Sequence, residues 1–445
     1  MRIPKRPPSE SALWERYAGA SKVGFERLGR YSGGPLVEGK YLHWDKLRHY
    51  TPPEGLNHEQ WWLGLKLTRE YRAERLPLTS TDNRGFWYVP CDPVPERLRE
   101  IDLGMGGAIG MPEQITNTET RDRYYVNSLI QEAITSSQLE GAATTREVAK
   151  EMIRTHRQPR DRSERMILNN FKTMRAISQL KDERLSKELI LQLHRTVTEG
   201  TLDKEDAAGR WRRADEQITV SDAYGEVLHV PPEAQLLEER MAALCNFANG
   251  KIPAGFVHPV IRSMVLHFWL AYDHPFIDGN GRTARALFYW SMLHHGYWLF
   301  EFVSISEIMV KAPARYGRAF LYTETDDNDL TYFIVYHLAV IDRAIKELHS
   351  YIGAKARQVQ ALEQELKGMM ALNYRQRALV SHALRHPNHR YTIKSQSTSH
   401  NVVYETARKD LLELQDRGLL RGWKVGKTWY FTPTKDMEQR LVDLP

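Results

Sequence analysis

Twelve consecutive residues decide the fold and the chemistry of this chain: His274-Pro275-Phe276-Ile277-Asp278-Gly279-Asn280-Gly281-Arg282-Thr283-Ala284-Arg285. They lie between two apolar stretches with helical spacing, residues 264–272 and 286–294. Gly279, Asn280 and Gly281 do not continue a helix comfortably, so they predict a tight loop whose backbone N–H groups can point at an anion. The loop opens the second helix, and a helix N-terminus binds phosphate well.

The side chains of this loop suit phosphate chemistry. Arg282 and Arg285 would place two planar cations on one turn, which fits a polyphosphate better than a single carboxylate. Asp278 could hold a magnesium ion through one carboxylate plus phosphate oxygens. His274, with an ordinary pKa of about 6.5, can take a proton from a hydroxyl near neutral pH. Phe276 is expected to anchor the loop in the core, and each of these features taken singly also has a purely structural explanation.

Taken together, the string resembles the Fic family, whose motif HxFx[D/E]GNGRxxR is met at every fixed position. The resemblance implies an all-α core that transfers a nucleotide, most often AMP from ATP, to a Ser, Thr or Tyr hydroxyl of a protein. By position, it implies a general base at His274, a Mg²⁺ ligand at Asp278, a phosphate-cradling loop at Gly279, Asn280 and Gly281, and phosphate clamps at Arg282 and Arg285.

Upstream of the motif, residues 217–220 and 227–230 flank a turn-prone segment and predict a β-hairpin between helices. In Fic proteins a hairpin at this place is the flap, which registers the target chain by strand addition. The resemblance therefore implies target docking at Ile218, Thr219 and Val220. The alternative is a hairpin with a structural role alone.

A second motif, Ser136-Ser137-Gln138-Leu139-Glu140-Gly141, fits the inhibitory pattern [S/T]xxxE[G/N] of Fic proteins. Gly141 also suits an ordinary helix end. The resemblance implies that Glu140 pairs with Arg285, blocks seating of the γ-phosphate and keeps the enzyme mostly off at rest. In some family members the same glutamate supports removal of AMP, so a dual role stays open.

Helical periodicity dominates residues 113–350, which we expect to form the Fic domain with its inhibitory helix. Residues 1–112 are expected to be an extension that packs on this core and contains a helix over 58–76, with Trp61 and Trp62 on its buried face. Residues 351–372 predict a helical linker. The predicted fold class is mainly α, with the hairpin flap and a C-terminal winged helix-turn-helix domain over 373–445.

The C-terminal segment is basic. Residues 374–435 contain 12 Lys and Arg against 4 Asp and Glu, so this segment carries 12 − 4 = +8 of a chain total of +6. It predicts a helix over 374–384, a strand at 391–393, a polar segment over 395–401, a helix over 402–414 and two short strands near 424–427. This order resembles a winged helix, with 402–414 as the recognition helix and 420–431 as the wing. Such modules bind DNA through phosphate contacts, or serve in protein docking and dimerisation.

The composition fits an ordinary globular protein, with 42% hydrophobic and 27% charged residues in 445. No apolar run reaches the length of a membrane span and the first residues lack a signal peptide's apolar region, so we expect a cytoplasmic protein without a membrane partner. Two cysteines, Cys91 and Cys245, cannot form a disulfide framework and are expected to be buried thiols.

The sequence therefore predicts an autoinhibited protein adenylyltransferase that uses ATP and Mg²⁺ and modifies a target protein or itself. DNA binding through the C-terminal domain and formation of a homodimer are further interactions that the sequence leaves open. One alternative is a DNA-binding regulator whose Fic core senses nucleotide or modifies only itself. A second alternative is a Fic enzyme with another donor, such as a different nucleotide or a phosphocholine carrier.

Overall fold

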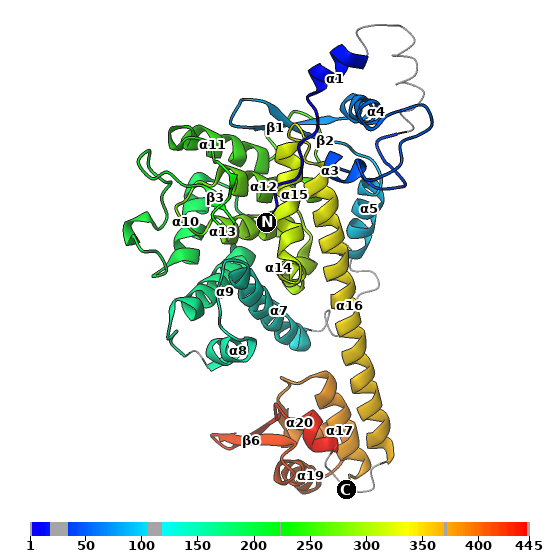
Figure 1. The fold of residues 1–445 in the computed structure, drawn as a ribbon. Coiled ribbons are helices and arrows are strands. Elements are labelled where there is room, and N and C mark those ends of the chain that lie inside the picture. The colour runs from blue at the N-terminus through cyan, green and yellow to red at the C-terminus, as the bar shows by residue number, and fades with distance from the viewer. Residues whose placement is uncertain are drawn as a thin grey trace. The chain divides into compact units, whose positions relative to one another are not determined.

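The computed structural model describes residues 2–17, 34–105, 118–155, 157–222, 224–368 and 372–442 (Figure 1). The chain divides into two compact units: Met1–Gly107 with Leu129–Ala344, and Ala108–Ser128 with Ile345–Pro445. The division falls within helix α7 (Thr118–Leu139) and within helix α16 (Thr331–Gly368). Both units are mainly helical, which confirms the predicted fold class. The finer domain boundaries expected at 112, 350 and 372 stay predictions.

Two helices at the centre of the first unit carry the motif between them. Helices α12 (Pro259–Asp273) and α13 (Asn280–His294) pack against each other, and most of their side chains are buried. Helices α9 (Arg162–Leu180) and α10 (Lys187–Thr198) cover α13, and α11 (Leu237–Ala248) covers α12. A helix buried on most of its surface is apolar all round, which explains the continuous hydrophobic runs on both sides of the motif.

The other elements of this unit surround that centre. They are α1 (Glu10–Tyr17), α3 (Trp44–Leu47), α4 (His58–Tyr71), β1 (Glu74–Thr79), β2 (Gly85–Tyr88), α5 (Val94–Met105), α8 (Arg146–Thr155), η1 (Glu205–Ala207), β3 (Val220–Ser221), β4 (Val227–His229), η2 (Ala234–Leu236), η3 (Trp298–Phe302), α14 (Ile305–Val310) and α15 (Pro313–Thr325).

The prediction of a helix over 58–76 is wrong at the C-terminal end of that range. Helix α4 ends at Tyr71, and the chain continues as β1, which pairs antiparallel with β2. Leu76 and Leu78 alternate with more exposed neighbours along β1, so this segment buries one face of a strand instead of a helical stripe. Trp61 and Trp62 lie in a hydrophobic cluster of this N-terminal region, which confirms that they are core residues.

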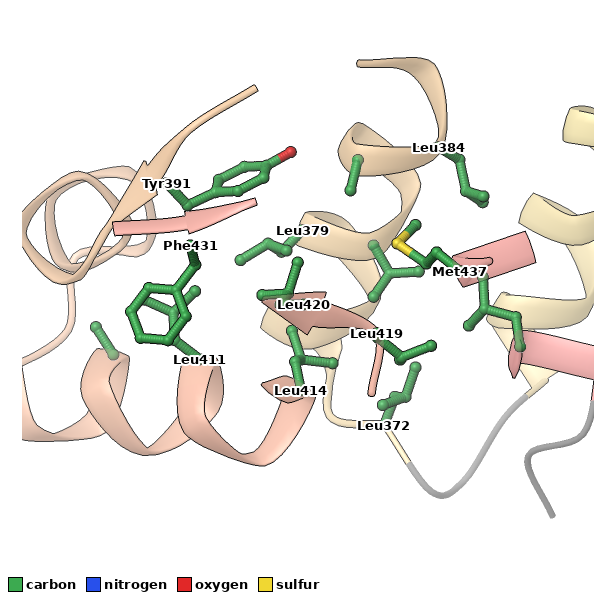
Figure 2. Close-up of a cluster of buried hydrophobic side chains, with 14 of the residues drawn as sticks. Leu372, Leu379, Leu384, Tyr391, Leu411, Leu414, Leu419, Leu420, Phe431 and Met437 are labelled. Carbon is green, nitrogen blue, oxygen red and sulfur yellow. The ribbon is translucent and has the colours of Figure 1, made fainter. Parts of the chain in front are cut away.

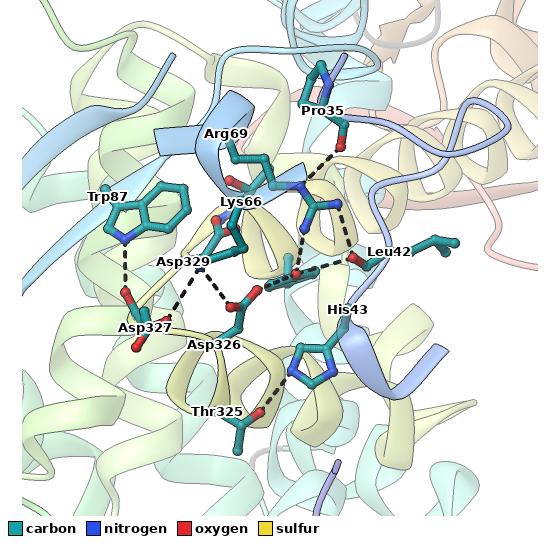
Figure 3. A network of polar contacts seen from close by, with 12 residues as sticks. Pro35, Leu42, His43, Lys66, Arg69, Trp87, Thr325, Asp326, Asp327 and Asp329 are labelled. Atoms are coloured by element: carbon teal, nitrogen blue, oxygen red, sulfur yellow. Dashed lines mark hydrogen bonds and ion pairs between the residues drawn. The ribbon is translucent and has the colours of Figure 1, made fainter. Parts of the chain in front are cut away.

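A buried polar network ties the N-terminal region to the segment between α15 and α16 (Figure 3). The ammonium of Lys66 lies 2.8 Å from Asp326 Oδ1, and Trp87 Nε1 donates to the carbonyl of Asp327. Tyr41 donates a hydrogen bond to Asp329. Charged groups of two distant segments thus neutralise each other inside the first unit.

The second unit has its own apolar core (Figure 2). Its elements are α17 (Tyr374–Arg385), β5 (Tyr391–Thr392), α18 (Ile393–His400), α19 (Tyr404–Asp416), β6 (Leu420–Val425), β7 (Thr428–Pro433) and α20 (Met437–Val442). The strands form an antiparallel sheet in the order β5-β7-β6. Leu379, Leu411 and Phe431 from three different elements meet in the core.

The polar segment 395–401, for which the sequence predicted no helix, folds largely as α18. Thr392 and Ser395 form a capping box at its N-terminus, and this local hydrogen bonding compensates for the weak helix propensity of its serines and threonines. The assignment of the unit as a winged helix stays a prediction.

Within the described residues, every helix is too short or too polar to span a lipid bilayer. Cys91 and Cys245 are both free and buried, as the sequence predicts.

Candidate active site

His274 caps the C-terminus of α12 in a left-handed conformation, with φ of 46°. Its Nδ1 lies 3.1 Å from the carbonyl oxygen of Ala271. Because a carbonyl can only accept, Nδ1 carries the proton of the neutral ring and Nε2 keeps its lone pair. Burial lowers the pKa of His274 to about 4, so the ring is neutral and ready to accept a proton at pH 7.

The loop after His274 is fixed by side chains on both sides. The amide of Asn280 accepts from the backbone N–H of Phe276 at 2.9 Å and donates to its carbonyl at 2.8 Å. Phe276 is fully buried, as predicted, and stacks on the ring of His194 at 3.6 Å. His194 Nε2 donates to the carbonyl of Asp278, while its Nδ1 accepts from the N–H of Gly209. No sequence motif pointed to His194, which lies 84 residues from Asp278 in the chain.

Gly279 is the N-cap residue of α13, and its conformation favours glycine. Its φ is +85°, and a Cβ atom there would lie 2.6 Å from Thr198 Cγ2. Because glycine has no side chain, the N-cap residue of α13 makes no side-chain hydrogen bond to the N–H groups of the first turn. The start of α13 is therefore suited to an anion.

Arg282 and Arg285 are both buried, with 1% of each residue exposed. Arg282 donates to the carbonyl of Val197 and lies 3.6 Å from Asp278 Oδ1, and burial lowers its pKa. Within the described part of the chain, Nε and Nη2 of Arg282 and Nη1 of Arg285 have no hydrogen-bond partner. Buried donors without acceptors are costly, so these nitrogens favour the approach of oxygens from a ligand or from water.

The structure brings Glu140 and Arg285 together. Glu140 Oε1 accepts from Arg285 Nη2 at 2.8 Å, and the side chain of Glu140 is 28% exposed. Ser136 holds the same guanidinium through its hydroxyl, at 2.8 Å, and through its carbonyl, at 2.9 Å. Gly141 has a φ of +89° two residues after the end of α7, so it also suits the helix end that the sequence allowed.

Glu132, two turns before Glu140, fastens α7 to the core. Its buried carboxylate accepts from the hydroxyls of Tyr289 and Ser304, both at 2.8 Å, and from the backbone N–H of Ser306 at 3.2 Å. No sequence motif pointed to this residue. Glu132 and Ser136 lie four residues apart on the buried part of α7, so they share the face that meets the core.

Asp278 is the candidate metal ligand. Its side chain is 40% exposed and lies 3.3 Å from Arg162 Nη2. Among the described residues no three His, Cys, Asp or Glu side chains gather as a metal site. The exposed carboxylate of Asp278 at the start of α13 is the kind of single protein ligand that suits a Mg²⁺ ion whose other positions are filled by phosphate oxygens and water.

The predicted hairpin forms as β3 and β4, but it is shorter than expected. Val220 lies in β3 opposite His229 of β4, while Ile218 and Thr219 precede the strand. Arg212, ahead of the hairpin, donates from Nε to the carbonyl of His274 at 3.0 Å, and its backbone N–H donates to Pro275 at 2.8 Å. Arg212 thus connects the entry of the hairpin directly to the motif, through hydrogen bonds that no sequence motif predicted.

Comparisons with known proteins agree with this geometry. Residues 184–292 match the Fic/DOC family. The chain is 39% identical over 107 residues to a protein adenylyltransferase Fic of Nematostella vectensis, and 36% identical over 108 residues to the protein of that name from Drosophila willistoni. Each match covers 24% of this chain, and 22% and 20% of the respective relative, so the chain spans a small part of their length.

A solved structure of a Fic family protein from Desulfovibrio desulfuricans superposes with a TM-score of 0.52 at 19% identity. The superposition covers 78% of this chain and 98% of that one. At this identity the likeness concerns the fold.

Proposed function

Because the chain carries a Fic domain, we propose that it is a protein adenylyltransferase that moves AMP from ATP to a Ser, Thr or Tyr hydroxyl of a target protein or of itself. The observation that carries this proposal is the set of buried arginine donors without acceptors beside a neutral histidine. Arg282 and Arg285 call for a polyanion, and His274 offers a base to a neighbouring hydroxyl.

In the proposed reaction the target oxygen attacks the α-phosphorus of ATP. A new O–P bond forms, the bond from phosphorus to the β-phosphate oxygen breaks, and pyrophosphate leaves with that electron pair. His274 Nε2 takes the hydroxyl proton, which its hydrogen bond to Ala271 permits by holding the other ring nitrogen protonated. Arg282, Arg285 and the first turn of α13 hold the phosphates in line. Magnesium bound at Asp278 would neutralise part of the phosphate charge.

We further propose that Glu140 inhibits this reaction at rest. Its carboxylate occupies Arg285 Nη2, and a Cβ atom on Gly281 would lie 2.2 Å from Glu140 Oε1, so Glu140 also covers the loop. A phosphate oxygen that approached Arg285 from this side would have to displace the carboxylate. Participation of Glu140 in removal of AMP is an additional possibility for the same site.

Intact-mass spectrometry after incubation with ATP and Mg²⁺ tests these proposals. We expect an AMP adduct to grow in Glu140→Gly relative to wild type and to vanish in Glu140→Gly/His274→Ala. Glu147→Gly, which removes an exposed glutamate of the neighbouring helix α8, is the matched control and should behave as wild type. Failure of Glu140→Gly to bind ATP with Mg²⁺ would overturn the main proposal, and adducts from another nucleotide would favour another donor.

DNA binding by the second unit is the second candidate function. Exposed cations without an acidic partner among the described residues lie before β5, on α18, on β6 and in the turn after it: Arg390, Lys394, Arg421, Lys424 and Lys427. On α19, by contrast, Arg408 pairs with Glu405, and Lys409 lies 3.9 Å from Glu413. The free positive charge therefore favours phosphate contacts by the β6–β7 turn.

Duplex DNA titrated at several salt concentrations tests this candidate. Lys424→Ala/Lys427→Ala should weaken binding for every sequence and flatten the log–log salt slope by about 2. Lys172→Ala in the first unit is the control. Binding that survives His274→Ala while no AMP adduct forms in Glu140→Gly would favour the regulator over the enzyme.

A further inference from the structure

His229 ends strand β4 of the hairpin, and its ring faces two helices of the core. Nδ1 lies 2.6 Å from Glu324 Oε2 on α15, and Nε2 lies 2.7 Å from the carbonyl oxygen of Tyr272 on α12. The side chains of His229 and Glu324 are 9% and 18% exposed. A carbonyl and a carboxylate are both acceptors, so each ring nitrogen donates and the ring is an imidazolium.

The surroundings of His229 support this charge state. Burial lowers the pKa of His229, but the hydrogen bond and charge of Glu324, the Tyr272 carbonyl and the charge of Asp273 together raise it above its ordinary value. The ring also packs against the ring of Tyr272. A charged histidine in such a site is stable only while these acceptors stay in place.

The surface that receives His229 is itself fixed. The hydroxyl of Tyr272 accepts from the backbone N–H of Thr81 at 3.1 Å. The next residue, Asp273, is fully buried and accepts from Arg240 of α11 and from Trp269. The end of α12 therefore cannot follow the hairpin if the hairpin moves.

We propose that His229 is a positioning residue that fastens the flap to the end of the helix that leads into His274. Arg212 ties the entry of the hairpin to the carbonyls of His274 and Pro275, and His229 ties its exit two residues before the base. Between these attachments, Tyr224 near the tip is 90% exposed. His229 also stands opposite Val220 in the hairpin. Its attachment to α12 therefore fixes the position of strand β3, and of any target strand added to it, relative to His274. The inference rests on the proposed function in taking this hairpin as the target-docking flap.

Hydrogen exchange of residues 217–230 tests the attachment without any need for AMP transfer. In His229→Ala and in Glu324→Gln, we expect the flap amides to exchange about tenfold faster or more, because a hydrogen bond to a charged group is lost in each. The effects should not add in the double variant, since both changes remove the same contact. His229→Gln should recover part of the protection, because its amide can still donate to the Tyr272 carbonyl.

His258→Ala is the matched control. His258 also pairs with a carboxylate, Asp102, at 3.1 Å, but at the opposite end of α12. Its loss should leave flap exchange as in wild type. ATP binding should be unchanged in all of these variants, which shows that the nucleotide site stays folded. Unchanged flap exchange in His229→Ala, or an equal rise in His258→Ala, would overturn the proposal.

The pH dependence gives a readout that a merely structural role would not move. The groups that face His229 are Glu324 from α15, Tyr272 and Asp273 from α12, with Arg240, Arg212 and His274 nearby. Since the pKa of His229 is raised in the folded state, protection of the flap should be complete near pH 6 and be lost as pH rises through the folded value. Glu324→Gln should abolish that dependence once exchange rates are corrected for intrinsic pH effects.

Transfer assays in the Glu140→Gly background separate the two proposals. If Glu140→Gly transfers AMP and Glu140→Gly/His229→Ala transfers it at the same rate, the positioning role fails and the proposed function stands. If Glu140→Gly transfers nothing, the proposed function loses its support, and flap exchange still decides whether His229 fastens the hairpin.

Discussion

Two clusters of buried cations in the described part of the first unit differ in how their nitrogens are paired. Lys66 and Arg69 lie in the polar network of Figure 3, and Arg282 and Arg285 lie in the motif; none of the four is more than 1% exposed. Arg69 donates from Nε, Nη1 and Nη2 to Pro35, Tyr332 and Leu42, at 3.1, 3.1 and 3.0 Å. Arg282 and Arg285 leave three nitrogens without an acceptor among the described residues.

Burial alone therefore does not identify a functional site. A buried cation in which every nitrogen already has a partner within the protein acts as part of the scaffold. A buried cation with unpaired nitrogens is stabilised when the oxygens of a ligand or of water approach it, so its cluster can accept a ligand.

The largest effect is expected in the cluster of Lys66 and Arg69, which we call the closed cluster because each of its nitrogens has a partner. Asp326→Ala leaves the ammonium of Lys66 without its carboxylate at 2.8 Å and takes an acceptor from Tyr332. We expect the free energy of unfolding of the first unit to fall by about 3–5 kcal/mol, measured by urea denaturation. Lys66→Met/Asp326→Leu should recover much of the loss, since neither member of this pair then stays buried without its partner. A loss as small as that of an exposed pair would contradict the scaffold role.

Removing the carboxylate of Glu140 from the cluster of Arg282 and Arg285 should instead raise the affinity for nucleotide. Glu140→Gly frees Arg285 Nη2 for a phosphate oxygen, and a charge-assisted hydrogen bond is worth about 1.5–3 kcal/mol. We expect ATP with Mg²⁺ to bind roughly 10- to 100-fold more tightly in calorimetric titration. Glu147→Gly should bind as wild type does. Equal affinities in Glu140→Gly and wild type would show that Glu140 does not compete with the nucleotide.

A smaller effect is expected from pH at Asp329, the weak point of the closed cluster. Burial and the nearby charge of Asp326 raise the pKa of Asp329 to about 6. Its folded state therefore takes up a proton that the unfolded state lacks between about pH 6 and 4, so this group favours folding more as pH falls. The stability of wild type relative to Asp329→Asn should rise by about 1–2 kcal/mol from pH 7.5 to 5. Urea denaturation of both proteins at both pH values measures this difference, and a constant difference would exclude titration of Asp329.

The smallest effect is expected at an exposed pair. Lys172 lies 3.0 Å from Glu199, with side chains 49% and 62% exposed. Lys172→Ala should change the free energy of unfolding by less than about 1 kcal/mol, because water solvates both charges once they are separated. Thermal unfolding in parallel with Asp326→Ala measures the contrast. A loss comparable to that of Asp326→Ala would show that burial is not what separates the two cases.

Local sequence signals predicted much of the fold. The apolar helices around the motif, the turn at Gly279 and the hairpin before it all follow from spacing within one or two turns of chain. Strand β1 was missed because its two buried leucines, Leu76 and Leu78, are too few to outweigh the helical pattern that precedes them. Only the pairing of β1 with β2 favours the strand.

By itself, the sequence determined the chemistry that is available: a histidine before a glycine loop, two arginines one turn apart, and a glutamate in an inhibitory motif. The tertiary structure decided which of these groups are free and which are occupied. Glu140 contacts Arg285 across 145 residues, His194 contacts Asp278 across 84, and His229 contacts Glu324 across 95. Hydrogen bonds between such distant residues leave no periodicity in the sequence, because they depend on how helices pack and not on the residues beside them in the chain.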